Sequence, residues 1–180
     1  MNLRSLPSVK AQRGAVLVVS LLLLLVMTLL ALGASQSTRL QERMAGNQRD
    51  MDLALQGAEA GLRGAEELLA PTVATIATCL APASHCEAYE QGVLPLDLTR
   101  QNQAWWNQWG RDYAVTTLGS LSSQPEFVIE HIGEVRDSIA VGGSYLNTVR
   151  DYHRSTARSN GMTPTAEVIL QSSHARISFE

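Results

Sequence analysis

The sequence predicts an α+β fold, in which one long N-terminal helix precedes a C-terminal antiparallel sheet. Three observations predict it. Residues 15–35 contain no charged residue and no proline. Beyond them, apolar residues recur at helical spacing as far as Leu69, and Pro71 supplies a stop. After Pro125 the chain becomes rich in alternating and β-branched residues, which are typical of strands.

The helix begins with a segment of membrane length. At a rise of about 1.5 Å per residue, residues 15–35 span about 30 Å, the thickness of a bilayer's hydrocarbon core. The leader before this segment, residues 1–14, carries Arg4, Lys10 and Arg13 and no acidic residue. Positive charges before an apolar segment predict a cytoplasmic N-terminus, with the C-terminal body on the other side of the membrane.

Two fates of the leader fit this pattern. The apolar segment is longer than the core of about 7–15 residues in a secretory signal peptide, and the small residue Gly14 precedes it. Cleavage after Gly14 would remove the leader and keep the helix, whereas an uncleaved signal anchor would keep both. The formal net charge of the chain is -3, so removing the leader's three positive charges leaves -6. Such an acidic body does not indicate nucleic-acid binding.

The second half of the helix, residues 36–70, is predicted to be amphipathic. Its apolar residues form a stripe on one helical face, which the rest of the chain is expected to cover. Gly57 and Gly61 share a face, which indicates either close packing against a sheet or helix, or merely tolerated flexibility. The stripe comprises Leu40, Met44, Met51, Leu55, Ala58, Leu62, Ala65 and Leu69.

Cys79 and Cys86 are the only cysteines in the sequence. Beyond a bacterial inner membrane the compartment is oxidising, so a disulfide is the preferred interpretation. A metal site with the neighbouring His85 is the alternative, although these three residues lack the usual four-ligand pattern. The spacing excludes a redox motif of the CxxC type.

The sequence pattern of residues 71–110 gives the least information on secondary structure. This part of the chain contains a tryptophan cluster in the segment QAWWNQWG. On a short helix, Trp105 and Trp109 are expected to dock on the core while Trp106 faces elsewhere. The cluster is a candidate interaction surface, because tryptophan is enriched at interaction hot spots. Packing in the core of a small domain is the favoured interpretation.

Three segments in the last third of the chain are predicted to be strands. They are residues 125–135, 145–159 and 166–180. Asn160 and Gly161 mark a turn between the last two segments, which predicts an antiparallel hairpin. With the first segment, the hairpin makes a sheet of three or more strands.

No constellation of residues supports catalysis. The sequence contains no phosphate-binding glycine loop, no HExxH motif and no GxSxG motif. Its histidines are scattered, so neither an enzyme nor a cofactor is predicted. A calcium site, which takes several oxygen ligands, is an alternative, but no loop has the regular Asp/Asn spacing that such sites need. Its candidate ligands are Glu126, Glu130, Glu134 and Asp137.

The segment from Gln12 to Arg63 resembles the N-terminal domain of PilX-type minor pilins, within the superfamily of type IV pilins and pseudopilins. Three parts carry the resemblance: Arg13-Gly14 before the apolar run, LQERMAGNQRD from Leu40 to Asp50, and AEAGLR from Ala58 to Arg63. The C-terminal segment YHRSTARSNGMTPTAEVILQSSHARI is similar to the closing hairpin of that family. The resemblance implies a pilin-like fold.

The resemblance also implies processing and partners. A prepilin peptidase would recognise Arg13 and Gly14, cut before Ala15, and methylate the new amino group of Ala15. The helix would anchor the subunit in the bacterial inner membrane until the assembly platform incorporates it beside other minor pilins and the major pilin. The globular domain, residues 71–180, would be periplasmic and then lie on the outside of the fibre. No direct nucleic-acid contact is implied.

One position departs from the pattern of the superfamily. Most pilins carry glutamate at the fifth residue of the mature chain, where this chain has Val19. A subunit without this charge need not dock onto a subunit above it, which suits the pilus tip. We therefore expect a minor pilin that primes assembly and caps the fibre, and thereby supports twitching motility, attachment or DNA uptake. The alternatives are a tip-type minor pseudopilin of type II secretion and a pilus-associated adhesin that binds through its tryptophans.

Overall fold

The structure is a computed structural model that describes residues 14–71, 76–83, 86–119, 121–136 and 148–179. The predicted residues Arg13, His85, Asp137 and Tyr145 lie outside these ranges. The chain divides into two compact units, Met1–Gly46 and Asn47–Glu180. Its elements are α1 (Ala15–Leu69), β1 (Thr78–Cys79), β2 (Ala88–Glu90), the 3-10 helix η1 (Leu98–Arg100), α2 (Gln103–Trp109), β3 (Arg111–Asp112), β4 (Glu126–Arg136), β5 (Thr148–Asn160) and β6 (Glu167–Phe179).

Helix α1 has the predicted bounds, Ala15 to Leu69. In its apolar part the hydroxyls of Ser20 and Thr28 donate hydrogen bonds to carbonyls one turn earlier, at 2.9 and 2.8 Å. These polar groups are therefore satisfied within the helix, as a lipid environment requires. The helix ends at Leu69 because Pro71 cannot continue the hydrogen-bond pattern.

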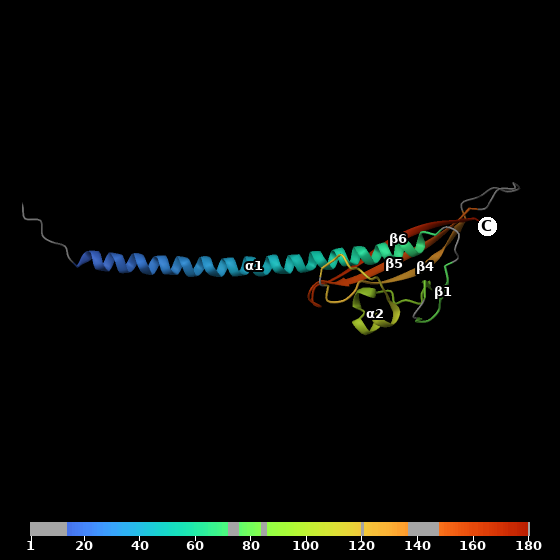
Figure 1. Cartoon of the computed structure of the whole chain (residues 1–180), viewed down its shortest axis with the longest axis horizontal. Coiled ribbons are helices and arrows are strands. Elements are labelled where there is room, and N and C mark those ends of the chain that lie inside the picture. Colours follow the sequence, from blue (N-terminus) through green and yellow to red (C-terminus); the bar gives the residue numbers. More distant parts are fainter. Residues whose placement is uncertain (1–13, 72–75, 84–85, 120, 137–147, 180) are drawn as a thin grey trace, which may run out of the picture. The chain divides into compact units, whose positions relative to one another are not determined.

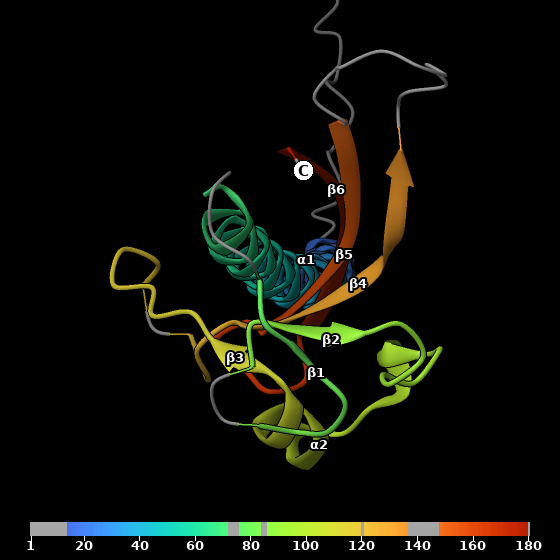
Figure 2. The same cartoon turned by 90° about the vertical axis from the view of Figure 1, so that its right-hand side faces the viewer.

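The second unit contains the predicted antiparallel sheet. Strands β4, β5 and β6 are neighbours, and thirteen residue pairs join β5 to β6, from Thr148↔Phe179 to Asn160↔Glu167. The sheet also has parts that the sequence did not reveal. Figure 1 shows β4, β5 and β6 beside one another, and Figure 2 shows the added strands. Strands β1 and β2 extend the sheet in parallel, in the order β1-β2-β4-β5-β6, and β3 pairs with β4. The α+β prediction is confirmed, with a sheet that is mostly antiparallel.

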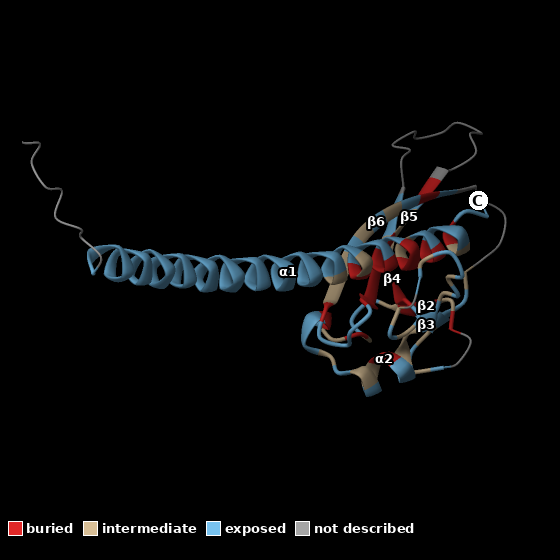
Figure 3. Ribbon diagram, turned by 60° about the vertical axis from the view of Figure 1, so that its left-hand side comes forward, coloured by how far each residue is buried: buried red, intermediate tan, exposed pale blue. Residues whose placement is uncertain are grey.

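Strand β4 carries a core on each of its faces, because successive side chains of a strand point to opposite sides. Phe127 and Ile129 belong to a cluster with Ala65 and Leu69 of α1. Val128 belongs to a second cluster that contains Trp106, 0% exposed, from α2. The C-terminal part of α1 and the short helix α2 thus lie on opposite faces of the sheet (Figure 2), and the buried residues of α1 and β4 face each other there (Figure 3).

The predicted stripe on the amphipathic part of α1 is only partly covered. Ala58, Ala65 and Leu69 are buried as expected, whereas Met51 and Leu55 remain 44% and 40% exposed. The buried face of α1 is instead made mostly of small residues, because the helix approaches the sheet closely. It comprises Ala54, Gly57, Ala58, Ala60, Gly61, Gly64, Ala65 and Leu69.

Candidate functional site

Glycines set the distance between α1 and the rest of the second unit. A Cβ atom at Gly57 would overlap the side chain of Ser159 in β5. At Gly61 it would lie 3.0 Å from the Cβ of Ala157. At Gly64 it would overlap the ring of Tyr113. The interpretation of Gly57 and Gly61 as close-packing positions is therefore confirmed, and the partner is the sheet.

One acidic residue of α1 binds the turn that joins β5 to β6. The carboxylate of Asp50 accepts hydrogen bonds from the backbone N–H of Met162 at 2.6 Å and of Thr163 at 3.3 Å. It also accepts one from the hydroxyl of Thr163. The hydroxyl of Thr163 is the main cause that holds the pKa of Asp50 below its ordinary value. At Gly161 a Cβ would overlap Asp50, so a glycine is needed beside this carboxylate.

Both cysteines lie at the β1–β2 edge of the sheet. The structure joins Cys79 to Cys86 by a disulfide, with the two Cα atoms 6.1 Å apart. Cys79 ends β1, and β1 pairs in parallel with β2, which starts two residues after Cys86. The disulfide therefore closes the short connection between two very short strands, which have few hydrogen bonds of their own.

The tryptophan cluster is arranged differently from the expectation. Trp106 is fully buried against the sheet, whereas Trp105 and Trp109 are half-buried and stack on each other, with ring centroids 5.8 Å apart. The expectation that Trp106 faces elsewhere is wrong. Asn102 begins the helix by accepting a hydrogen bond from the N–H of Trp105, and Trp106 packs with Val128 of β4. Pattern alone did not reveal it, because α2 has only seven residues.

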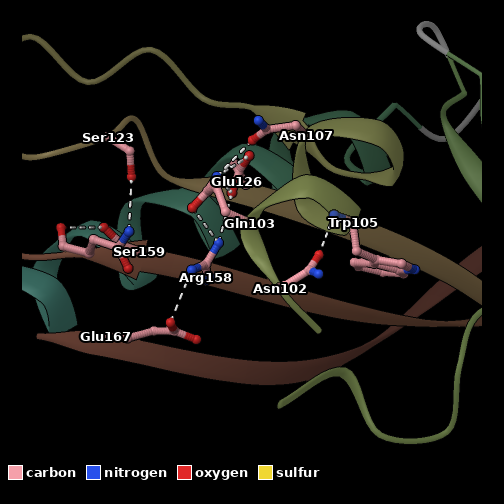
Figure 4. A network of polar contacts seen from close by, with 10 residues as sticks. Asn102, Gln103, Trp105, Asn107, Ser123, Glu126, Arg158, Ser159 and Glu167 are labelled. Atoms are coloured by element: carbon pink, nitrogen blue, oxygen red, sulfur yellow. Dashed lines mark hydrogen bonds and ion pairs between the residues drawn. The ribbon is translucent and has the colours of Figure 1, made fainter. Parts of the chain in front are cut away.

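A buried ionic network holds α2 on the sheet (Figure 4). Arg158 donates hydrogen bonds to Gln103 at 2.7 Å, to Glu167 at 3.0 Å and to Glu126 at 3.5 Å. Its guanidinium carbon also lies 5.9 Å from the ring centroid of Trp106. Burial raises the pKa of Glu126, while the hydrogen bond from Gln103 and the charge of Arg158 oppose this rise.

The three candidate calcium ligands that the structure describes, Glu126, Glu130 and Glu134, do not form one site. Glu126 is engaged with Arg158, and Glu130 forms a close ion pair with Arg154. Both belong to the α2 side of β4. Glu134 follows a β-bulge between His131 and Gly133, and Asp137 lies outside the described residues. The calcium hypothesis therefore has no support in the described part of the chain.

The N-terminal unit presents apolar side chains outward. In an 18-residue window of α1 the mean hydropathy is 3.1, and no residue of that window is buried within the protein. Gly14 precedes the helix in an exposed turn, Ala15 is its first residue, and Val19 is exposed. Length and composition fit a single-pass membrane anchor.

An apolar N-terminal helix, whose C-terminal part packs through small residues on an antiparallel sheet, is the architecture of a type IV pilin-like protein. Comparison with protein families is consistent with this class. The PilX N-terminal domain matches residues 13–63, and the C-terminal domain of the type IV pilus assembly protein PilX matches residues 72–176. The chain belongs to the PilX family of type IV pilus assembly proteins.

Membership makes this chain a minor pilin of type IV pilus assembly, a structural role that implies contacts with other pilus components. The second match also covers residues 72–110, where the sequence pattern predicts no regular element with clarity. No curated protein and no solved structure matched the chain.

Proposed function

We propose that this minor pilin primes type IV pilus assembly and lies at the pilus tip. The observation that carries the proposal is Val19, the fifth residue counted from Ala15. In most pilins a glutamate there pairs with the amino terminus of a neighbouring subunit. Valine is fully compatible with lipid and removes the cost of a charge in the membrane, but it provides no ionic contact to a subunit further up.

Processing at the leader is part of the proposal. A prepilin peptidase recognises Arg13 and Gly14, cuts between Gly14 and Ala15, and methylates Ala15. The family match that begins at residue 13 and the exposed position of Gly14 support this assignment. Mass spectrometry of the membrane-extracted protein should find a methylated N-terminus at Ala15. An intact Met1 in peptidase-competent cells would contradict it, and Gly14→Val should abolish cleavage.

The proposed topology follows from the leader charges. Residues 1–14 lie in the cytoplasm, residues 15–35 cross the bacterial inner membrane, and residues 36–70 continue the helix into the periplasm together with the domain of residues 71–180. The partners are the major pilin, other minor pilins and the inner-membrane assembly platform. A phosphatase fused after Glu180 should be active only if this end is periplasmic.

The tip assignment is tested by supplying the missing charge. Val19→Glu should allow incorporation along the fibre shaft, which cross-linking or antibody labelling of sheared pili would detect. Val18→Glu is the matched control, because it places the same charge one residue away from the fifth position. If the Val19→Glu protein and the unchanged protein both occur only at the tip, the missing charge does not assign the position.

Two alternatives remain distinguishable. A tip pseudopilin of a type II secretion system shares the leader, the helix and the missing charge, but the matched family is one of pilus assembly. Loss of secretion with intact pili in a deletion strain would favour that alternative. A pilus-associated adhesin would use the tryptophans, and the burial of Trp106 removes one of the three from such a surface.

A further inference from the structure

A second group of polar side chains lies on the α1 side of the sheet. Ligating atoms of His131, Glu134 and Asp151 all lie within 4.8 Å of one another. A tetrahedral ion with bonds of about 2 Å holds its ligand atoms about 3.3 Å apart. Small side-chain rotations would therefore bring these three atoms onto one ion.

The β-bulge in β4 creates this arrangement. His131 is paired with His153, and after the bulge Glu134 is paired with Asp151. In a regular strand, residues three apart point to opposite faces. The extra residue, Ile132, restores Glu134 to the face of His131. Since His153 and Asp151 are two apart in β5, the four side chains share one face.

His153 adds an independent observation. It is 3% exposed, its ring centroid lies 5.2 Å from that of His131, and its Nδ1 makes no hydrogen bond in the described part of the chain. A buried imidazole nitrogen without a partner is costly unless something else binds it. His153 lies directly opposite His131, next to the cluster.

Glu90 in β2 completes the surroundings of His131. Its Oε1 lies 3.6 Å from Nδ1 of His131. This distance is too long for a hydrogen bond, so the contact does not decide which ring nitrogen of His131 provides the ligand atom. The positive Arg176, paired with Asp151 across the sheet, offsets part of the negative charge.

We propose that His131, Glu134 and Asp151 bind a divalent transition-metal ion of the zinc class, with the buried His153 beside the site and water completing the coordination. Imidazole together with carboxylates suits zinc, whereas calcium takes oxygen ligands only. Because the ligands come from two strands, the ion would join β4 to β5 at the bulge, where their backbone pairing shifts. The proposal stands independently of the tip assignment.

The test uses the full chain in detergent micelles, freed of metal with a chelator and titrated with zinc chloride by calorimetry. We expect one ion per chain and a higher midpoint of thermal unfolding in its presence. Glu134→Gln and Asp151→Asn should each weaken binding by about tenfold or more. Cobalt(II) should give the visible absorption of a four-coordinate site in the unchanged protein, and this absorption should be lost in Glu134→Gln and Asp151→Asn.

Glu134→Gln is the decisive variant, because Glu134 is exposed and its substitution leaves the core intact. Glu59→Gln, an exposed acid on α1, is the matched control and should bind zinc like the unchanged protein. Absence of binding would overturn the proposal. Equal affinity in the Glu134→Gln, Asp151→Asn and unchanged proteins would also overturn it, since the ion would then lie elsewhere.

Discussion

Asp50 and Thr163 are joined by hydrogen bonds across 113 residues of sequence. The contact attaches the middle of α1 to the turn between β5 and β6, so one carboxylate fixes the position of the hairpin along the helix. Asp50 ends the segment LQERMAGNQRD, one of the three parts on which the family resemblance rested. The polar character of that segment thus has a structural reason at its last residue.

Replacing Asp50 with asparagine should lower the midpoint of thermal unfolding of the full chain in detergent. An amide cannot accept all three hydrogen bonds that the carboxylate receives from Met162 and Thr163. Asp52→Asn is the control, because Asp52 is exposed and accepts a hydrogen bond from Gln48 within its own helix. Equal effects of the two substitutions would show that the contact to the turn contributes nothing.

The same carboxylate predicts an acid dependence. Because the pKa of Asp50 is lowered on folding, its contribution to stability is complete above the ordinary value of 3.8 and is lost as the pH falls toward the lowered pKa. Unfolding midpoints measured at several acidic pH values should therefore fall less steeply in Asp50→Asn than in the unchanged protein. Parallel pH profiles would contradict the assignment.

Gly57→Ala should destabilise the second unit by about 1–3 kcal/mol, because the added methyl group overlaps Ser159. Gly46→Ala makes the same change in α1 where a Cβ meets nothing within 4 Å. It should be neutral or stabilise the helix by up to about 1 kcal/mol. Denaturant unfolding followed by circular dichroism compares the two, and a stabilising Gly57→Ala would refute close packing.

Trp106→Ala should cost about 3–5 kcal/mol, since it empties a fully buried site between α2 and β4. Trp105→Ala should cost less, because Trp105 is half-buried. The unfolding free energy of each variant measures this difference. If cells with Trp105→Ala keep their pili but lose surface attachment, the adhesin alternative gains support, whereas loss of folding supports the core interpretation.

Replacing Cys79 and Cys86 together with serine should lower the free energy of unfolding by about 2–3 kcal/mol, the effect expected for a loop of this length. A reductant should produce a similar loss in the unchanged protein. It should have no effect on the double variant, which is therefore its own control. Equal stability of oxidised and reduced protein would show that the loop is held by other contacts.

Much of the fold could be predicted because its signals are local. The absence of proline from Ala15 to Leu69 and the apolar spacing set both ends of α1. The branched residues and the Asn160-Gly161 turn located the hairpin of β5 and β6. These signals come from residues that are close together in the sequence, so they can be recognised without a structure.

The rest depends on contacts between distant residues. The apolar stripe predicted the buried face of α1 only in part, because the helix approaches the sheet through small residues such as Gly57 and Gly61, while Leu55 stays 40% exposed. No local pattern pairs Asp50 with Thr163. Glu134 joins His131 and Asp151 only because of the bulge, and the glycine within the strand, Gly133, is its one local sign.

Adjacent residues of β5 point to opposite faces of the sheet, and the surroundings on the two faces differ in chemistry. Ala157 meets Gly61, while the adjacent Arg158 reaches Glu126 and Glu167. Removing or adding a single residue before this pair would exchange their directions, and a guanidinium would then be forced against the glycines of α1. We therefore expect natural relatives to vary in side chains along this strand but to conserve its length, so that insertions accumulate in the connections and not within β5.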